Sequence, residues 1–379
     1  MESGIETLFS KQPIVIDNGS GIMKAGFSGD ERPKMVFNNY VGRTKYSKQM
    51  LTTNDLDLYL GPECEKHKGL YKLSYPMTHG NVTNWDDMEK IWGYIFKEMK
   101  VSASQHPVLL SEPIENPMIN REKTAEAFFE GMGAPALYFQ TQPVLSLYAQ
   151  GKTTGFVLDC GDGVTQCVPI VEGFAITGAY SRIDLGGRDI TEYFMLLLKR
   201  AGYNFHTSAE FQIVRQIKEK ICTATTSPFR EDEYKDHLKG TNIEYFLPDG
   251  SILNLKNEHM EAPEILFTPQ KIGLEYPGIP EMLINCVMKC DIDLRNTIFS
   301  NLIVSGGTSA LKKFAERLHK SITKLSPKDV KIKLVAPKNR DISTWVGGST
   351  LSSLKAFNDL WVTKEEYKEK GANVFREYM

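Results

Sequence analysis

The chain has few cysteines, and they form no pattern that would bind a metal or staple a fold. Six cysteines occur in 379 residues without a C-x-x-C pair, and no H-E-x-x-H motif accompanies them. The sequence also lacks eighteen consecutive apolar residues, and its first residues lack the basic and apolar regions of a secretory signal. We therefore expect a soluble, cytoplasmic chain with reduced thiols and no membrane insertion.

The chain also lacks an excess of charge of either sign. Lys and Arg number 45 against 47 Asp and Glu, which gives a formal net charge of −2. A nucleic-acid protein or a protein held on anionic lipid would need a strong basic field, so we expect neither partner. Hydrophobic residues at 41% and charged residues at 24% are typical of a globular chain. At about 150 residues per domain, the length predicts two or three domains.

A weak internal repeat is the most informative feature. Residues 14–27 and 156–170 each contain an apolar run, then Asp-x-Gly-x-Gly, then a second β-prone run. This pattern predicts a β-hairpin whose tight turn uses glycine torsions. Asp17 and Asp159 begin the two turns and lie 142 residues apart, about one domain length. We expect two similar domains that face each other across a cleft, with the two turns opposite one another.

Helix-like and strand-like segments alternate along the rest of the chain, which predicts an α/β fold. Two glycine pairs, 306–307 and 347–348, are expected to begin helices. A helix start of this kind offers free N–H groups to a phosphate, and the alternative is close packing of a helix on a strand. The segments expected to be helices are 85–99, 121–132 and 190–201, and those expected to be strands are 108–110, 136–139 and 302–304.

The paired hairpins suggest a way to hold a phosphate chain. Backbone N–H groups of residues 20–22 and 162–164 would form two anion-binding concavities, and Lys24 would neutralise phosphate charge. Asp17 and Asp159 would then face each other as like charges. A hydrated Mg²⁺ bridged to substrate phosphates would relieve that repulsion.

Other phosphate-binding motifs are incomplete. Gly151-Lys152-Thr153 matches the end of a P-loop, but Ser146 stands where the first glycine is required, and the order of helix and strand is reversed. No G-x-G-x-x-G follows a strand, which argues against a nicotinamide fold. The polar stretches 45–57 and 223–242 are expected to be solvated excursions.

The sequence resembles the actin family over nearly its whole length. The similarity is carried by residues 17–21, 82–92, 144–149, 161–165, 217–220, 305–308 and 345–349. The opening Met-Glu-Ser and residues 60–69, 205–211, 299–301, 327–332 and 343–345 are more similar to the centractin-like branch than to conventional actin. The resemblance implies two duplicated α/β domains flanking a nucleotide cleft, each with an inserted subdomain. The implied boundaries are 1–38, 76–149 and 342–379 for the outer domain, with insert 39–75, and 150–185 and 275–341 for the inner domain, with insert 186–274.

The resemblance also implies roles for individual residues. Asp17, Gln142 and Asp159 would hold hydrated Mg²⁺ (or Ca²⁺), and Gln142 would place the attacking water. ATP or ADP would be bound by residues from both turns, from the helix that contains Lys218, and from the glycine pair near Thr308. These residues are Gly19, Ser20, Gly21, Ile22, Lys24, Gly161, Asp162, Gly163, Val164, Gly187, Lys218, Glu219, Gly306, Gly307, Thr308, Leu311 and Asp341. A groove for partner helices would be lined by Tyr148, Gly151, Thr153, Leu351 and Leu354.

Several positions depart from the family pattern. Gln166 stands where actin has a histidine that orients the lytic water, and loss of such a group slows a reaction by about 10² to 10⁴. Pro143 fixes the backbone at the hinge. Asp341 and Leu311 replace adenine-side residues, and Lys271 replaces an aromatic residue in an inter-strand plug. The 45–57 loop also differs, and Glu2 and Glu6 are the only acidic residues near the amino terminus.

Together these features predict a cytoskeletal protein, at most a weak ATPase, that self-associates into short filaments. The resemblance implies dynactin subunits, dynein and capping proteins as partners. A divergent conventional actin is the second hypothesis. A sugar kinase or a chaperone of the same superfamily, and a chromatin-associated relative, are alternatives from other classes. The sequence shows no second-substrate base, no added peptide-binding domain and no nuclear basic run to support them.

Overall fold

The two Asp-x-Gly-x-Gly repeats form antiparallel hairpins at the centre of two separate sheets. In the computed structural model, which describes residues 11–45, 58–229 and 243–376, β1 (Ile14–Asp17) pairs with β2 (Ile22–Phe27), and β11 (Gly155–Cys160) pairs with β12 (Thr165–Val171). Every residue of β1 and β11 is buried, as expected for apolar strands covered on both faces.

The sheets repeat one topology, which confirms the predicted duplication. In each, the first hairpin strand also has a parallel neighbour that arrives by a crossover: β1 pairs with β9 (Val108–Glu112), and β11 pairs with β17 (Leu302–Ser305). A third parallel strand follows in each sheet, β10 (Ala136–Thr141) and β18 (Leu334–Val335). The remaining strands are β3 (Met35–Asn38) and β19 (Val362–Thr363) in the first sheet, and β13 (Phe174–Ala175) and β14 (Ser181–Ile183) in the second.

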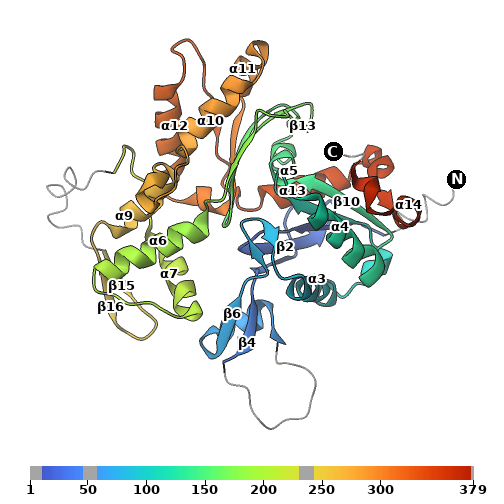
Figure 1. Ribbon diagram of the computed structural model, residues 1–379, viewed down its shortest axis with the longest axis horizontal. Coiled ribbons are helices and arrows are strands. Elements are labelled where there is room, and N and C mark those ends of the chain that lie inside the picture. The colour runs from blue at the N-terminus through green and yellow to red at the C-terminus, as the bar shows by residue number, and fades with distance from the viewer. Residues whose placement is uncertain (1–10, 46–57, 230–242, 377–379) are drawn as a thin grey trace, which may run out of the picture.

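Helices surround the first sheet, on the right of Figure 1. The predicted helix over 85–99 is confirmed as α3 (Trp85–Met99). Asn84 caps its first turn by accepting a hydrogen bond from the Asp87 N–H, and its apolar stripe is buried around Trp92. The other helices of this half are α4 (Met118–Glu126), continued by a π-helical turn (Ala127–Gly131), α5 (Gln142–Tyr148), α13 (Ser343–Ser352) and α14 (Lys364–Lys370).

The second sheet is covered by a second set of helices, on the left and at the top of Figure 1. The expected helix over 190–201 begins earlier, directly after Gly186, as α6 (Gly187–Arg200). The others are α7 (Ser208–Ile221), α9 (Glu258–Glu261), α10 (Ile279–Lys289), α11 (Ile292–Phe299) and α12 (Phe314–Leu325), with a separate hairpin of β15 (Ile243–Phe246) and β16 (Ile252–Leu255). A large apolar core lies within each half.

A small insert extends from the first half, at the bottom of Figure 1. It contains β4 (Val41–Thr44), β5 (Leu58–Tyr59), α2 (Gly61–Lys66) and β6 (Tyr71–Ser74), followed by the short pair β7 (Met77–Thr78) and β8 (Asn81–Val82). Most of the two expected polar excursions, 46–57 and 230–242, lies outside the described residues, as do Glu2 and Glu6.

The prediction that two glycine pairs begin helices was partly wrong. Gly307 begins a short 3₁₀ helix, η6 (Gly307–Ala310), and α12 starts only at Phe314. Gly347 and Gly348 lie inside α13, where glycine serves packing: a Cβ on Gly347 would lie 1.7 Å from the Leu145 carbonyl oxygen of α5. Here the packing alternative is the correct one.

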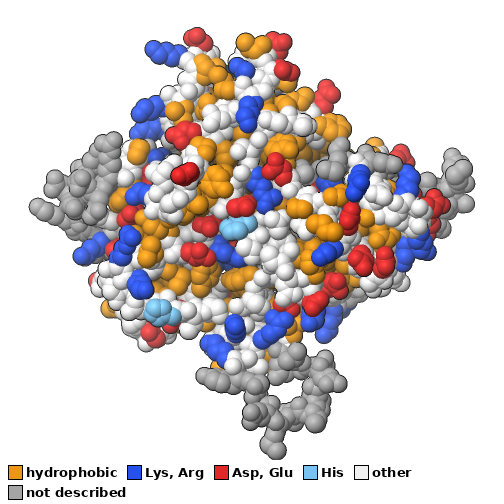
Figure 2. Space-filling view, viewed as in Figure 1, with side chains coloured by type: hydrophobic (Ala, Val, Ile, Leu, Met, Phe, Trp, Pro, Cys, Tyr) orange, Lys and Arg blue, Asp and Glu red, His pale blue; other side chains and the backbone are white. Residues whose placement is uncertain are grey.

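All six cysteines are buried and free. Within the described residues, no helix is both long and apolar enough to cross a bilayer. On the face seen in Figure 2, basic and acidic side chains are interspersed.

Candidate functional site

The two glycine turns meet at the junction of the two halves. We call residues 18–21 the first turn and residues 161–164 the second turn. A Cβ on Gly21 would lie 2.6 Å from the Asp162 Cγ, and one on Gly163 would lie 2.9 Å from the Ser20 Oγ. The two turns are therefore in direct contact across the junction, as the repeat predicted.

Three of the glycines in these turns, Gly19, Gly21 and Gly163, are needed for space rather than for torsion. None of Gly19, Gly21, Gly161 and Gly163 has a positive φ, so the expectation of unusual glycine torsions was wrong. Gly19 instead lacks room for a side chain, because an added Cβ would lie 2.3 Å from the Ile22 carbonyl oxygen. Close approach of backbone to backbone is the physical requirement.

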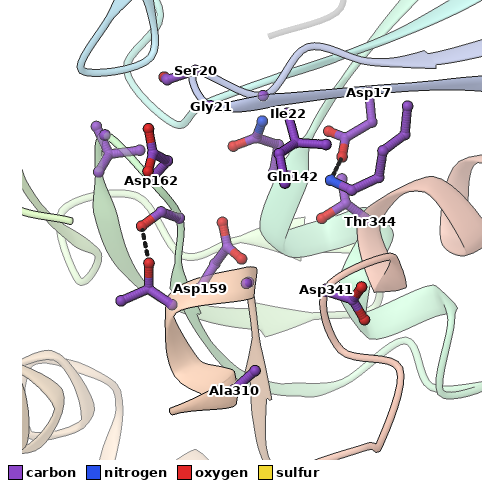
Figure 3. Close-up of a pocket in the computed structure, with 18 of the residues that line it drawn as sticks. Asp17, Ser20, Gly21, Ile22, Gln142, Asp159, Asp162, Ala310, Asp341 and Thr344 are labelled. Carbon is purple, nitrogen blue, oxygen red and sulfur yellow. Dashed lines mark hydrogen bonds and ion pairs between the residues drawn. The ribbon is translucent and has the colours of Figure 1, made fainter. Parts of the chain in front are cut away.

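A cavity of about 360 Å³ opens beside the turns. Its volume lies at the lower end of the range for small-molecule sites. Figure 3 shows Asp17 and Ser20 on the side of the first hairpin, and Asp159 and Asp162 on the side of the second. Nearly all residues implied by the resemblance line it: Asp17, Gly19, Ser20, Gly21, Ile22, Lys24, Gln142, Asp159, Gly161, Asp162, Gly163, Val164, Lys218, Glu219, Gly306, Gly307, Thr308, Leu311 and Asp341.

Two expected residues lie behind the cavity wall. Gly187 accepts a hydrogen bond from the buried Lys218 Nζ at 2.6 Å, so it orients a wall residue. Gln166 is fully buried on β12. Its amide contacts the site indirectly, through hydrogen bonds to Gln142 and Asp159, which line the cavity.

Asp17 and Asp159 form the acidic floor of the cavity. The Asp17 carboxylate accepts hydrogen bonds from Lys24 Nζ at 2.8 Å and from Ser111 Oγ at 2.6 Å. Burial, and then the negative charge of Asp17, raise the pKa of Asp159 to about 6. The predicted repulsion between the two carboxyl groups is therefore present, and a cation placed between them would relieve it.

Gln142, Gln166 and Asp159 are linked by hydrogen bonds. Gln166 Nε2 donates to Gln142 Oε1 at 3.2 Å and to Asp159 Oδ2 at 3.4 Å, while its Oε1 accepts from the backbone N–H of Ile114 at 2.6 Å. Gln142 Nε2 donates in turn to the Asn18 carbonyl oxygen at 3.4 Å. Both ends of the Gln142 amide are thus already engaged by protein groups.

Another wall of the cavity combines residues of α7 with η6. Burial lowers the pKa of Lys218, and Arg215 donates from Nε to Glu219 Oε1 at 3.0 Å. Thr308 donates to the Gly161 carbonyl oxygen at 2.7 Å and so ties η6 to the second turn. Gly306 has φ +88°, and a Cβ there would lie 2.1 Å from the Cys160 carbonyl oxygen, so only glycine fits.

Sequence reasoning missed six residues of the cavity wall. Arg215 lies one turn before Lys218 and Glu219 on α7, so helical spacing could have identified it. Val36 and Gly80 reach the wall through sheet topology, which gave no local signal. The six are Asn18, Val36, Gly80, Arg215, Ala310 and Thr344.

The residues expected to form a partner groove lie around the ends of two packed helices. Tyr148 ends α5, and Gly151 and Thr153 follow in the turn before β11. Leu351 lies near the end of α13, and Leu354, which follows it, is 52% exposed. The structure brings these residues to one region, and their role stays a prediction.

The chain that forms this site matches a model of a known protein family. The family model described as Actin matches residues 9–379. The chain belongs to the actin family. Proteins of this family generally bind ATP or ADP with a divalent cation, self-associate into filaments and act in the cytoplasmic cytoskeleton. The actin-like fold, with two duplicated α/β halves and a cavity between them, agrees with that membership.

The cavity of this actin-family chain fits a nucleotide with a hydrated cation. Both turns line the cavity together with the cationic side chains of Lys24 and Lys218, which suit a phosphate chain, and the buried acidic pair favours a cation. Among the described residues, no three His, Cys, Asp or Glu side chains gather closely enough to hold a metal directly. A cation held through water and phosphate oxygens is the arrangement that Mg²⁺ prefers.

Proposed function

We propose that this chain is an ATP-binding actin-related protein that hydrolyses ATP slowly and assembles into short filaments, as the core filament of dynactin in dynein-driven transport. The single observation that supports nucleotide binding is the contact of two glycine turns, from duplicated sheets, beside a buried acidic pair. When bound, Mg²⁺ (or Ca²⁺) would supply positive charge shared with phosphate oxygens. Asp17, Asp159 and Gln142 would hold it through water, and Lys24 would neutralise further phosphate charge.

Nucleotide binding is tested by titrating ATP with Mg²⁺ into nucleotide-free protein in a calorimeter. We expect saturable binding that is weakened by Gly163→Ala, because the new Cβ would push the turns apart at Ser20 and at the His79 backbone. Gly69→Ala is the matched control, since an added Cβ there meets no atom within 4 Å. Absence of binding by the wild-type chain would refute the proposal.

Slow hydrolysis is supported by the position of Gln166. Its amide donates to Gln142 Oε1 and to Asp159 Oδ2, so it holds these two groups in place and presents no basic nitrogen to an attacking water. An amide also takes up no proton near neutral pH, unlike histidine. We expect Gln166→His to accelerate phosphate release by about 10² or more. Gln166→Leu should give no gain, and equal rates for wild type and Gln166→His would contradict the argument.

Short filaments are supported by Lys271 in η5 (Pro269–Ile272). Its ammonium pairs with Glu261 at 3.3 Å and lies 5.5 Å from the Phe229 ring centroid, so it is held against its own subdomain. A lysine head also resists the desolvation that a buried contact between strands would require. In electron micrographs we expect Lys271→Phe to form longer filaments than wild type. Lys199→Phe, on the exposed face of α6, should not.

The dynactin assignment depends on partners. A pull-down that recovers dynactin subunits, dynein or capping proteins would support it. Abundant micrometre filaments of the isolated protein would favour the second candidate, a divergent conventional actin with dynamic filaments. The sugar kinase alternative would require ADP production that depends on added sugar.

A further inference from the structure

Three buried hydroxyl groups lie in a row behind the wall of the cavity. Ser146 on α5, Ser305 at the end of β17 and Thr344 on α13 contribute one hydroxyl each. The Ser146 Oγ lies 2.9 Å from the Ser305 Oγ and 3.0 Å from the Thr344 Oγ1. Ser146 and Ser305 are fully buried, and Thr344 is 7% exposed. We call these three side chains the hydroxyl row, with Ser146 as its middle member.

One end of the hydroxyl row reaches the acidic floor of the cavity. Ser305 is the register partner of Asp159 on the neighbouring strand β11. Burial raises the pKa of Asp159, and a hydrogen bond from the Ser305 side chain opposes that rise. The Arg340 carbonyl oxygen also lies 3.5 Å from the Ser305 Oγ, beyond the usual hydrogen-bond range. Because hydrogen bonds to a charged acceptor are the stronger ones, Ser305 donates to the Asp159 carboxylate.

The other end of the hydroxyl row reaches the cavity at a different place. Thr344 is one of the wall residues that sequence reasoning missed, and Figure 3 shows it apart from Asp159. The row therefore connects two parts of the cavity surface through the buried interior. It also joins α5 and α13 to the sheet that carries Asp159.

The direction of the hydrogen bonds follows from counting protons. A hydroxyl has one proton to donate, and a carboxylate can only accept. Because Ser305 donates to Asp159, it must accept from Ser146, and Ser146 must in turn accept from Thr344. All three hydroxyls thus donate in one sense, toward the carboxylate, and hydrogen bonds aligned in this way strengthen one another. Toward the cavity, the Thr344 oxygen is left as an acceptor.

We propose that the hydroxyl row positions the Asp159 carboxylate for the hydrated cation, with Ser146 and Thr344 acting through Ser305. The inference rests on the nucleotide and cation site proposed above. Groups that hold a metal-binding carboxylate from behind set its orientation, and their loss typically weakens metal binding by about 10- to 100-fold. The effect should be largest at Ser305, which touches the carboxylate, and smaller at the more distant members of the row.

The test measures the affinity of ATP-loaded protein for Mg²⁺ by competition with a fluorescent magnesium indicator. We expect Ser305→Ala to weaken Mg²⁺ binding by about tenfold and Ser146→Ala by about fivefold. Ser349→Ala is the matched control. Ser349 is also a buried serine of α13, but its hydroxyl donates to the Asp30 carbonyl oxygen at 2.7 Å, so Mg²⁺ affinity should stay within about twofold of wild type.

Thr344 separates the hydroxyl row from a general effect on stability. Thr344→Val removes the hydroxyl while keeping the shape of the side chain, and we expect it to weaken Mg²⁺ binding by about threefold. Thr344→Ser keeps the hydroxyl and should restore wild-type affinity. Because Ser146→Ala already interrupts the row, adding Thr344→Val to it should weaken Mg²⁺ binding no further. A merely structural role would instead make Mg²⁺ affinity follow the melting temperature in every variant, Ser349→Ala included.

The possible results distinguish this inference from the proposed function. Mg²⁺ affinities of Ser305→Ala and Ser146→Ala within about twofold of wild type, or single effects that multiply in the double variant, would overturn the inference while the nucleotide site stands. If either alanine variant does not fold, the comparison of Thr344→Val with Thr344→Ser decides, and equal affinities overturn the inference. A wild-type chain that binds no ATP would refute the proposed function itself.

Discussion

Gly347→Ala should destabilise the protein because α13 packs backbone to backbone on α5. The new methyl would lie 1.7 Å from the Leu145 carbonyl oxygen and 2.4 Å from its carbon. A carbon–oxygen contact needs about 3.3 Å, so the helices must separate by about 1.6 Å. No flexible side chain can move aside, since the nearest atoms all belong to the Leu145 backbone.

The magnitude follows from two opposing effects. Overpacking of a core costs about 1 to 3 kcal/mol and occasionally more, and a backbone clash this severe belongs at the upper end. Alanine in place of glycine within a helix returns about 1 kcal/mol. We expect a net loss of at least about 2 kcal/mol in the free energy of unfolding. Because α5 begins with Gln142, the shift should also weaken nucleotide binding.

The assay is urea unfolding followed by circular dichroism, with Gly93→Ala as the matched control. Gly93 lies within α3, and an added Cβ there meets no atom within 4 Å. The control should therefore gain about 0.5 to 1 kcal/mol. If Gly347→Ala is as stable as wild type, the reasoning about helix contact is refuted.

Two further predictions concern buried charges. The pKa of Asp159 is raised on folding from 3.8 to about 6, so its contribution to stability is full below pH 3.8 and is lost as the pH rises through 6. Asp159→Asn should therefore stabilise nucleotide-free protein by about 3 kcal/mol at pH 8 and by little at pH 4, and an equal gain at both values in urea titrations would contradict this. Arg317 pairs with Glu264 at 3.1 Å in a site where both side chains are at most 5% exposed. Arg317→Met should cost about 3 to 5 kcal/mol because it leaves a buried carboxylate unpaired, and adding Glu264→Leu should recover much of that loss on thermal unfolding.

The local sequence pattern was sufficient to predict those elements whose structure is determined by their own residues. The helix over 85–99 could be predicted because its apolar spacing and the Asn84 cap agree, and the duplicated hairpins followed from their shared Asp-x-Gly-x-Gly. Facts that depend on distant neighbours could not be read locally. Gly347 is glycine because α5 lies against it, and Gly80 reaches the cavity because of how β7 and β8 fold back.

The chemistry of the site could likewise be predicted only in part from the sequence. The identity of Gln166 indicated an altered hydrolysis step, but only the structure shows that its amide binds Gln142 and Asp159 at once. Arg188 at the start of α6 carried no sequence signal, since its side chain contacts Ser20 of the first turn, Asp162 of the second turn and Tyr75 at the end of the insert. Contacts made by one residue with three separate parts of the chain leave no spacing to detect.

The chain passes between the two halves twice, and both passages are in the same place. It leaves the first half after α5, enters β11, and returns from β18 into α13, and α5 and α13 lie side by side (Figure 1). These two adjacent passages form a hinge with one axis, so the halves can rotate about it while each sheet keeps its internal pairing. Displacement then grows with distance from that axis, which makes the outer rim, where the insert meets α7, the place where a small rotation produces the largest opening.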